Sequence, residues 1–254
     1  MIEIKNLIKK YNGNTVLSID ELNIDKGKMY AIIGPNGSGK STLFKSISNK
    51  IIPDRGSIIL DNKNIKEYNK LEFAKKISII NQSTDISLDI SIEDLVSFGR
   101  YPYNQGKLTK MDMSIIRKAI KDIGIEDIKD KYITKLSGGE RQRALIAMIL
   151  AQQSNYILLD EPLNNLDMKS QYNLMNLLRI LINKYNKTVL IILHDISFAL
   201  NYADRIILLD HGKIVENCIP EELNDKTLGA VYGTPLKITR VNESSSYICD
   251  YYYH

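Results

Sequence analysis

The chain has little cysteine, no long apolar run and no block of like charge, and each absence excludes a class of protein. Its two cysteines, Cys218 and Cys249, show no metal-ligand spacing, which favours a reduced, cytoplasmic setting. No apolar run approaches the roughly 18–20 residues that span a bilayer. The 34 basic and 30 acidic residues are scattered, so nucleic-acid binding is not expected. The first four residues are strand-like and acidic, which predicts no secretory signal.

A glycine-rich loop near the start of the chain follows the pattern G-x-x-x-x-G-K-S/T. It stands between an apolar stretch at 29–33 and a predicted helix at 41–51. Such a loop turns backbone N–H groups toward phosphate oxygens, so it predicts nucleoside triphosphate binding. Lys40 is expected to reach the β- and γ-phosphates, and the Ser41 hydroxyl to hold Mg²⁺. The predicted phosphate-binding residues are Gly34, Pro35, Asn36, Gly37, Ser38, Gly39, Lys40, Ser41 and Thr42.

A second glycine pair follows about a hundred residues later, within the segment Leu-Ser-Gly-Gly-Glu. Ser137 and Glu140 have the spacing of a capping box and predict a helix that runs to Gln152. Gly138 and Gly139 leave bare N–H groups beside the Ser137 hydroxyl, a surface that suits the phosphate of a second nucleotide. Taken alone, the segment is better explained as an ordinary capped helix.

Two carboxylates follow the next apolar stretch, at 156–159. Asp160 ends this predicted buried strand, where it can bind Mg²⁺ directly or through water. Glu161 is the candidate general base for an attacking water. Strand-end carboxylates often only cap helices, but four apolar residues before them and Pro162 after them favour the catalytic interpretation.

The order and spacing of these motifs resemble an ABC-type ATPase cassette, the nucleotide-binding subunit of a transporter, over residues 1 to about 240. The resemblance implies ATP and Mg²⁺ as ligands, with Lys40 and Glu161 in catalysis. It implies that Gln82 touches Mg²⁺ or the water and senses the membrane partner. It also implies that His194, which follows the predicted strand at 189–193, contacts the γ-phosphate.

Two further positions are carried by the resemblance. Tyr11 matches the aromatic residue that stacks on adenine in this family, although an ordinary edge-strand tyrosine is the alternative. Asp167 belongs to Asn-Asn-Leu-Asp at 164–167, which matches the loop that crosses to the opposing monomer.

The expected fold is an α/β P-loop NTPase cassette with a mostly parallel core sheet, an antiparallel β edge and an inserted helical subdomain. Predicted strands at 2–4, 18–24, 29–33, 57–60, 77–80, 156–159, 189–193 and 205–209 belong to the sheets. Their alternation with helices, including one at 168–185, predicts parallel pairing with right-handed crossovers. His211 and Gly212 predict a hairpin turn.

The whole chain is predicted to be one cassette domain. Residues 1–84 and 156–240 form its nucleotide-binding core, and residues from about 85 to 155 form the helical subdomain with the signature segment. Residues 241–254 form a tyrosine-rich tail that carries no motif and is either an edge strand or a loose end.

The sequence holds one phosphate loop and one signature helix, which predicts a two-fold homodimer. By the family resemblance, the partners are membrane permease subunits at the cytoplasmic face of the membrane. An extracytoplasmic substrate-binding protein takes part indirectly.

The cargo is suggested by two segments, 98–103 and 160–168, which are similar to ATPases of iron–siderophore importers. Haem and cobalamin importers belong to the same wider group. A soluble accessory ATPase of iron–sulfur assembly is the alternative outside transport, and the possible docking segment at Arg100, Tyr101 and Pro102 distinguishes the two. Chromosome-organising and translation-type proteins carry coiled-coil insertions or two cassettes, and this sequence has neither.

Overall fold

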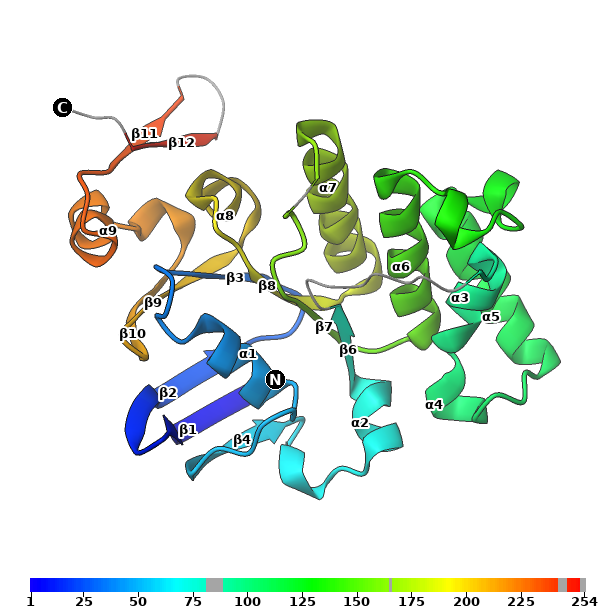
Figure 1. Ribbon diagram of the computed structural model, residues 1–254, viewed down its shortest axis with the longest axis horizontal. Helices are drawn as coiled ribbons and strands as arrows, with labels where there is room; N and C mark the ends of the chain where they lie inside the picture. Colours follow the sequence, from blue (N-terminus) through cyan, green and yellow to red (C-terminus); the bar gives the residue numbers. More distant parts are fainter. Residues whose placement is uncertain (81–88, 165, 242–245, 252–254) are drawn as a thin grey trace.

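The computed structural model describes residues 1–80, 89–164, 166–241 and 246–251. Two large sheets and a layer of helices make up the molecule, and a small hairpin lies at the C-terminal end (Figure 1). The strand orders are β2-β1-β4-β5 in one sheet and β10-β9-β3-β8-β7-β6 in the other. The predicted fold class is confirmed.

The six-stranded sheet is parallel except at one edge. Its strands are β3 (Met29–Ile33), β6 (Ile77–Ile80), β7 (Tyr156–Leu159), β8 (Thr188–Ile192), β9 (Arg205–Asp210) and β10 (Lys213–Cys218). Only the pair of β9 and β10 is antiparallel, and it is joined by the predicted hairpin turn at His211 and Gly212, both with positive φ. Strands β3, β7 and β8 are buried along their whole length, as expected for a sheet covered on both faces. Because β3, β7 and β8 run parallel, their carboxyl ends meet at one edge of the sheet.

The antiparallel sheet contains β1 (Ile2–Tyr11), β2 (Asn14–Ile24), β4 (Arg55–Leu60) and β5 (Lys63–Asn64). A tight turn at Asn12 and Gly13, with φ of 51° and 82°, joins β1 to β2. Both strands are longer than the sequence predicted, because alternation of apolar and polar residues is weak toward their turn.

Helix α1 (Lys40–Ile47) lies between the two sheets and buries Leu43, Phe44 and Ile47 in the core that they share. It ends earlier than the predicted helix at 41–51. Asn49 adopts a left-handed conformation with φ of 55°, and the N–H groups of Lys50 and Ile51 turn back to the Lys45 carbonyl. These contacts close the helix.

The core on the other face of the parallel sheet is built with helices. They are α3 (Ile92–Phe98), α5 (Lys110–Ile123), α6 (Gly138–Gln152), α7 (Met168–Tyr185) and α8 (Ile196–Tyr202). The short helix α4 (Tyr101–Asn104) packs against α2 (Lys70–Lys76) instead. Helices α3, α5 and α6 pack on one another, where the sequence predicted a helical subdomain. In the ranges that the structure describes, no helix is long and apolar enough to cross a membrane.

The remaining elements are short. Helix α2 (Lys70–Lys76) precedes β6, α9 (Asp225–Tyr232) follows β10, and single 3₁₀ turns occur at Ile65–Glu67, Glu126–Ile128, Ile133–Lys135 and Pro220–Glu222. Part of the tail is a strand, β12 (Tyr247–Asp250), which pairs with β11 (Lys237–Arg240) in a separate sheet. It is therefore not an edge strand of either large sheet.

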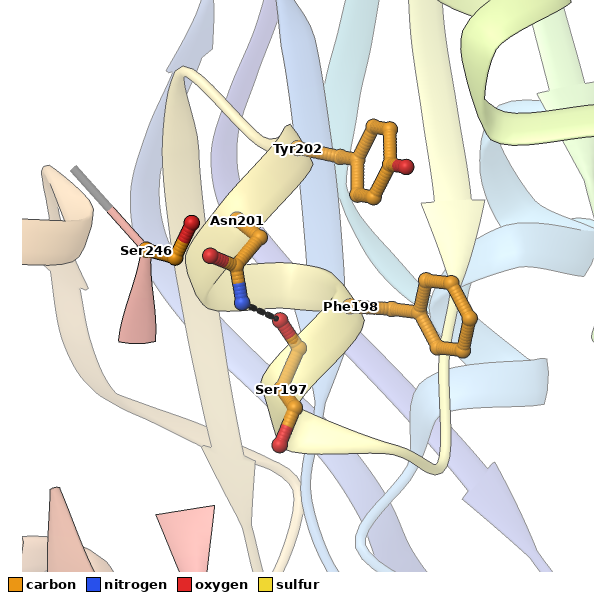
Figure 2. Close-up of a pocket in the computed structure, with 5 residues that line it drawn as sticks. All are labelled: Ser197, Phe198, Asn201, Tyr202 and Ser246. Atoms are coloured by element: carbon orange, nitrogen blue, oxygen red, sulfur yellow. Dashed lines mark hydrogen bonds between the residues drawn. The ribbon is translucent and has the colours of Figure 1, made fainter. Parts of the chain in front are cut away.

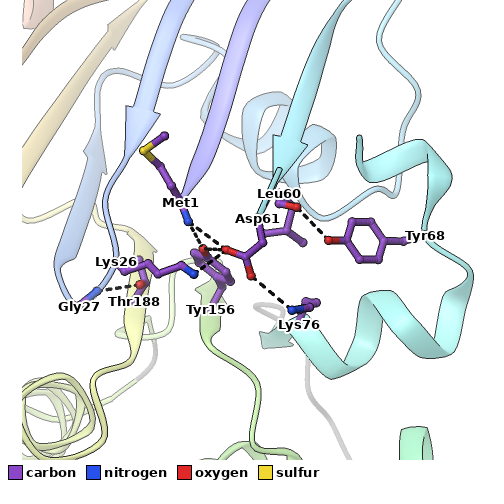
Figure 3. A network of polar contacts seen from close by, with 9 residues as sticks. All are labelled: Met1, Lys26, Gly27, Leu60, Asp61, Tyr68, Lys76, Tyr156 and Thr188. Carbon is purple, nitrogen blue, oxygen red and sulfur yellow. Dashed lines mark hydrogen bonds and ion pairs between the residues drawn. The ribbon is translucent and has the colours of Figure 1, made fainter. Parts of the chain in front are cut away.

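Asp61 joins the antiparallel sheet to the start of β7 (Figure 3). Its carboxylate lies 2.8 Å from the Lys26 ammonium and accepts a hydrogen bond of 2.8 Å from the Tyr156 hydroxyl; Lys76 and the amino group of Met1 also contact it. Burial alone would raise the pKa of Asp61, but these hydrogen bonds hold it well below its usual value.

A buried ion pair fixes the segment before α5. Arg100 Nε lies 2.9 Å from Asp112 Oδ1, and Arg100 also donates to the Ala151 carbonyl at 2.8 Å. Asp112 accepts the Thr109 N–H in a capping box as well. Burial would raise the pKa of Asp112, but the hydrogen bonds from Thr109 and Arg100 hold it well below its usual value.

Replacing Asp112 with alanine leaves the Arg100 guanidinium buried without its counter-charge. We expect Asp112→Ala to lower the free energy of unfolding by about 3–5 kcal/mol, measured by urea denaturation. Asp94→Ala is the matched control, because Asp94 closes a similar capping box with Ser91 but is exposed. The control should cost only about 1 kcal/mol. Equal losses in both variants would mean that the ion pair adds nothing.

Candidate functional site

The glycine-rich loop lies between β3 and α1, at the carboxyl edge of the parallel sheet. Its three glycines have positive φ: 144° at Gly34, 80° at Gly37 and 102° at Gly39. A Cβ at Gly34 would lie 2.1 Å from the Leu209 carbonyl oxygen, so no side chain fits there. A Cβ at Gly37 would meet nothing within 4 Å. The loop is therefore packed tightly at its start and open at its middle.

The outer side of this loop is held by backbone contacts. The Ser38 N–H donates to the Pro35 carbonyl at 3.2 Å, and the Ser38 carbonyl accepts the Gly212 N–H at 2.9 Å. The Ser38 hydroxyl is buried and has no hydrogen-bond partner among the described residues. A buried unpaired hydroxyl beside an open glycine loop fits an absent anionic ligand.

Lys40 opens α1, with its side chain folded back on the loop. Its ammonium donates to the carbonyls of Gly34, at 2.7 Å, and Pro35, at 2.9 Å. Burial lowers the pKa of Lys40, and the nearby carboxylates Asp160 and Glu161 oppose this shift. Among the described residues, the Lys40 ammonium has only these carbonyls at hydrogen-bond distance, and a phosphate could replace them.

The two predicted carboxylates and the predicted histidine come together, because β7 and β8 are parallel neighbours. Glu161 Oε1 lies 2.8 Å from His194 Nε2, and Glu161 Oε2 accepts a hydrogen bond of 2.8 Å from Asn164 Nδ2. Glu161 has a φ of 50°, an uncommon conformation for a side-chain-bearing residue. The contact with Asn164 had no signal in the sequence. A cavity of about 210 Å³ adjoins these side chains.

Asp160 is half-buried beside Glu161. Burial raises the pKa of Asp160, and the charge of Glu161 raises it further. The exposed Ser41 hydroxyl, in the first turn of α1, offers a second oxygen donor. Gln82 lies outside the described residues. The described part of the chain has no group of three or more acidic, histidine or cysteine residues that could hold a metal. A carboxylate and a hydroxyl supply oxygen donors, the ligand type that Mg²⁺ prefers.

Three further predicted residues, Tyr11, Ser137 and Asp167, are exposed. Tyr11 ends β1 with 43% of its surface exposed, and the Lys9 ammonium lies 5.5 Å from the centre of its ring. Ser137 and Glu140 form the predicted capping box at the start of α6. Asp167 caps α7 by accepting the Ser170 N–H at 2.7 Å.

Gly138 and Gly139, in the first turn of α6, carry no Cβ. A Cβ at Gly138 would meet no atom within 4 Å, so the N-terminal end of α6 is open for a ligand or a second chain.

The profile of the ABC transporter family matches residues 17–164 of the chain. The petrobactin import ATP-binding protein YclP of Bacillus subtilis is 45% identical over 243 residues, covering 95% of this chain and 96% of the relative. The ferric enterobactin transport ATP-binding protein FepC of Escherichia coli is 38% identical over 226 residues, covering 88% and 83%. The chain belongs to the ATP-binding proteins of the ABC transporter family.

Solved structures agree with this assignment. An ABC transporter described as metal-chelate type, in an inward-facing conformation, matches with a TM-score of 0.84 and 25% identity, over 98% of this chain and 95% of the other. The dimeric cassette MJ0796 matches with a TM-score of 0.73 and 30% identity, over 88% of this chain and 100% of the other. Nucleotide binding follows from the family, and cassettes of this family form dimers.

The raised pKa of Asp160 predicts that its ionised carboxylate lowers the stability of the fold as the pH rises. Because the folded chain holds this proton more tightly than the unfolded chain, stability falls as pH rises from the unfolded pKa through the folded one. We therefore expect Asp160→Asn to raise the melting temperature at pH 7.5 without nucleotide or Mg²⁺, and to lose this advantage as the pH is lowered.

Asp167→Asn is the control, because hydrogen bonds from Ser170 lower the pKa of Asp167. Its effect at pH 7.5 should have the opposite sign. If the Asp160→Asn protein melts at or below the wild-type temperature at pH 7.5, the ionised Asp160 carboxylate does not destabilise the fold and the prediction is wrong.

Proposed function

We propose that the chain is the ATP-binding and ATP-hydrolysing subunit of an importer for a ferric siderophore or a related iron chelate. The observation that carries this proposal is the convergence of Lys40, Asp160, Glu161 and His194 at one sheet edge. The relatives named above support the cargo, since one carries petrobactin and another ferric enterobactin in its name.

The phosphate groups of ATP are proposed to lie in the open middle of the loop, at Gly37. Backbone N–H groups and the start of α1 favour negative charge there. Lys40 then turns from the carbonyls of Gly34 and Pro35 to the β- and γ-phosphates, and Tyr11 stacks on the adenine. Mg²⁺, held by Ser41 and Asp160 with Gln82 as a further ligand, would neutralise phosphate charge when bound.

Glu161 is proposed as the general base. Water attacks the γ-phosphorus, and the bond from the γ-phosphorus to the oxygen that bridges it to the β-phosphorus breaks. A proton of the water passes to Glu161, and the products are ADP and phosphate. His194, whose Nε2 is 2.8 Å from Glu161 Oε1, orients this carboxylate and contacts the γ-phosphate. The adjoining cavity of about 210 Å³ has room for the water.

The working unit is proposed to be a head-to-tail homodimer. Ser137, Gly138 and Gly139 of one copy close on ATP that is held by Lys40 of the other, and Asp167 links the two sites. The open start of α6 supports this arrangement, and so does the dimeric MJ0796 cassette. Two identical sites follow from two-fold symmetry.

The membrane permease is proposed to dock beside α3 and α4, at the cytoplasmic face of the membrane. Phe98 is 50% exposed and Tyr101 is 54% exposed, so both can contact a partner. Arg100 and Pro102 are buried and support the segment from within. Tyr101 is therefore the residue of the predicted docking segment at 100–102 whose side chain a partner would contact. The extracytoplasmic binding protein acts through the permease.

Two substitutions separate binding from hydrolysis. Lys40→Ala removes the ammonium that would contact the phosphates, so it should weaken ATP binding and abolish hydrolysis. Glu161→Gln keeps the binding surface but removes the base, so it should bind ATP as the wild type does and hydrolyse it at least about 100-fold more slowly. Binding is measured by calorimetry, and hydrolysis by phosphate release from the complex with the permease.

With ATP bound and not hydrolysed, Glu161→Gln should elute as a dimer in size-exclusion chromatography, whereas Lys40→Ala should remain a monomer. Wild-type turnover by the Glu161→Gln complex would exclude Glu161 as the general base. ATP binding by Lys40→Ala at wild-type affinity would exclude the loop as the phosphate site.

The cargo is tested by uptake of a radiolabelled ferric siderophore into a strain that lacks this gene. Deletion should abolish uptake, the wild-type gene should restore it, and the Glu161→Gln gene should not. A defect confined to haem or cobalamin would transfer the assignment to that cargo. Normal uptake of all three, with loss of iron–sulfur enzyme activity, would favour the accessory ATPase instead.

A further inference from the structure

Gly34, the first residue of the phosphate loop, has a hydrogen bond from far along the chain. Its N–H donates to the hydroxyl of Tyr232 at 2.9 Å, across 198 residues of sequence. Tyr232 is the last residue of α9, and the helix ends there because Gly233 has a φ of 67°. Burial raises the pKa of Tyr232, so its hydroxyl stays neutral over the working pH range.

This hydrogen bond is one of several contacts that hold Gly34 in place. On one side the Leu209 carbonyl comes so close that even a Cβ would not fit. The Gly34 carbonyl is held by the Lys40 ammonium at 2.7 Å. If Lys40 turns to a phosphate, as proposed above, the carbonyl loses this partner. The hydrogen bond to Tyr232 then remains to fix the residue at which the loop leaves β3.

The C-terminal hairpin follows α9 and packs on α8. The Asn201 amide clasps the backbone of Tyr247, donating to its carbonyl at 2.7 Å and accepting its N–H at 2.8 Å. The Cys249 N–H donates to the Ser197 hydroxyl at 3.3 Å. Figure 2 shows Asn201 and Ser197 on the side of α8 that faces Ser246, next to this hairpin. The segment after α9 is thereby tied to the helix that begins just after His194.

We propose that Tyr232 is a positioning residue for the phosphate loop: its hydroxyl holds the Gly34 N–H and so keeps the loop in the shape that accepts the phosphates of a nucleotide. The inference rests on the proposed role of the loop. It assigns a part in nucleotide binding to the C-terminal segment, which carries no nucleotide motif.

The test is Tyr232→Phe in the full chain, which removes the hydroxyl and keeps the ring. With AMP-PNP and Mg²⁺ as the probe, we expect the Kd to rise about fivefold, the factor that one neutral hydrogen bond represents. The KM for ATP should rise by a similar factor and the kcat should change less. The melting temperature without nucleotide should also fall, by about 2–4 °C, because this hydrogen bond is part of the fold itself.

Tyr202→Phe is the matched control, because it removes a tyrosine hydroxyl from α8, where Tyr202 projects from the side opposite Asn201 (Figure 2). It should leave the Kd for AMP-PNP unchanged. A Kd for Tyr232→Phe within twofold of the wild type would overturn the inference. So would a lower melting temperature with an unchanged Kd, the signature of a purely structural hydroxyl.

The Lys40→Ala variant separates this inference from the proposed function. If Lys40→Ala binds AMP-PNP normally, the loop is not the phosphate site and both ideas fail. If Lys40→Ala loses binding while Tyr232→Phe does not, only the role of Tyr232 fails.

Discussion

Charge brought together at the carboxyl edge of the parallel sheet is the constraint on which the rest of the site depends. Lys40, Asp160 and Glu161 lie where burial disfavours each charge, and the pKa values of Lys40 and Asp160 are shifted accordingly. The attraction of Lys40 to the two carboxylates offsets only part of that cost, because the carboxylates of Asp160 and Glu161 repel each other. In the proposed function, phosphate and a cation supply the charges that complete this site.

The parallel sheet makes this arrangement possible. Strands β3, β7 and β8 are each followed within two residues by a residue of the site. The side chains of these strands are buried, which leaves the strands little freedom to move. The contact between Glu161 and His194 follows directly from the pairing of β7 with β8. The nucleotide loop is held from outside by β9 and the turn after it, so its shape does not require a bound ligand.

Much of the site could be predicted from the sequence because its signals are local. The spacing of glycines before Lys40, the carboxylates after four apolar residues, and the capping box at Ser137 each depend on neighbours in the chain. Contacts made by folding had no such signal. The hydroxyl of Tyr232 reaches Gly34 across 198 residues, and nothing around Tyr232 marks it. The buried pair of Arg100 and Asp112, 12 residues apart, had no such signal either.

Helix boundaries and the tail were also beyond local reasoning. The end of α1 depends on the left-handed turn at Asn49. The spacing of apolar residues up to Ile51 does not indicate this turn. The strand at Tyr247–Asp250 exists because β11 pairs with it, so its conformation is a property of two segments together. Gln82 lies outside the described residues and stays a prediction.

The two hydrogen bonds between the Asn201 amide and the backbone of Tyr247 protect a strand edge from pairing with another chain. Strand β12 has β11 on one side, and an open strand edge on the other side would invite pairing with another chain. Side chains of α8 take up the N–H and carbonyl of Tyr247 and the N–H of Cys249 instead. The outer edge of β12 is thereby closed to pairing with a further strand, although the described part of the chain builds no third strand there.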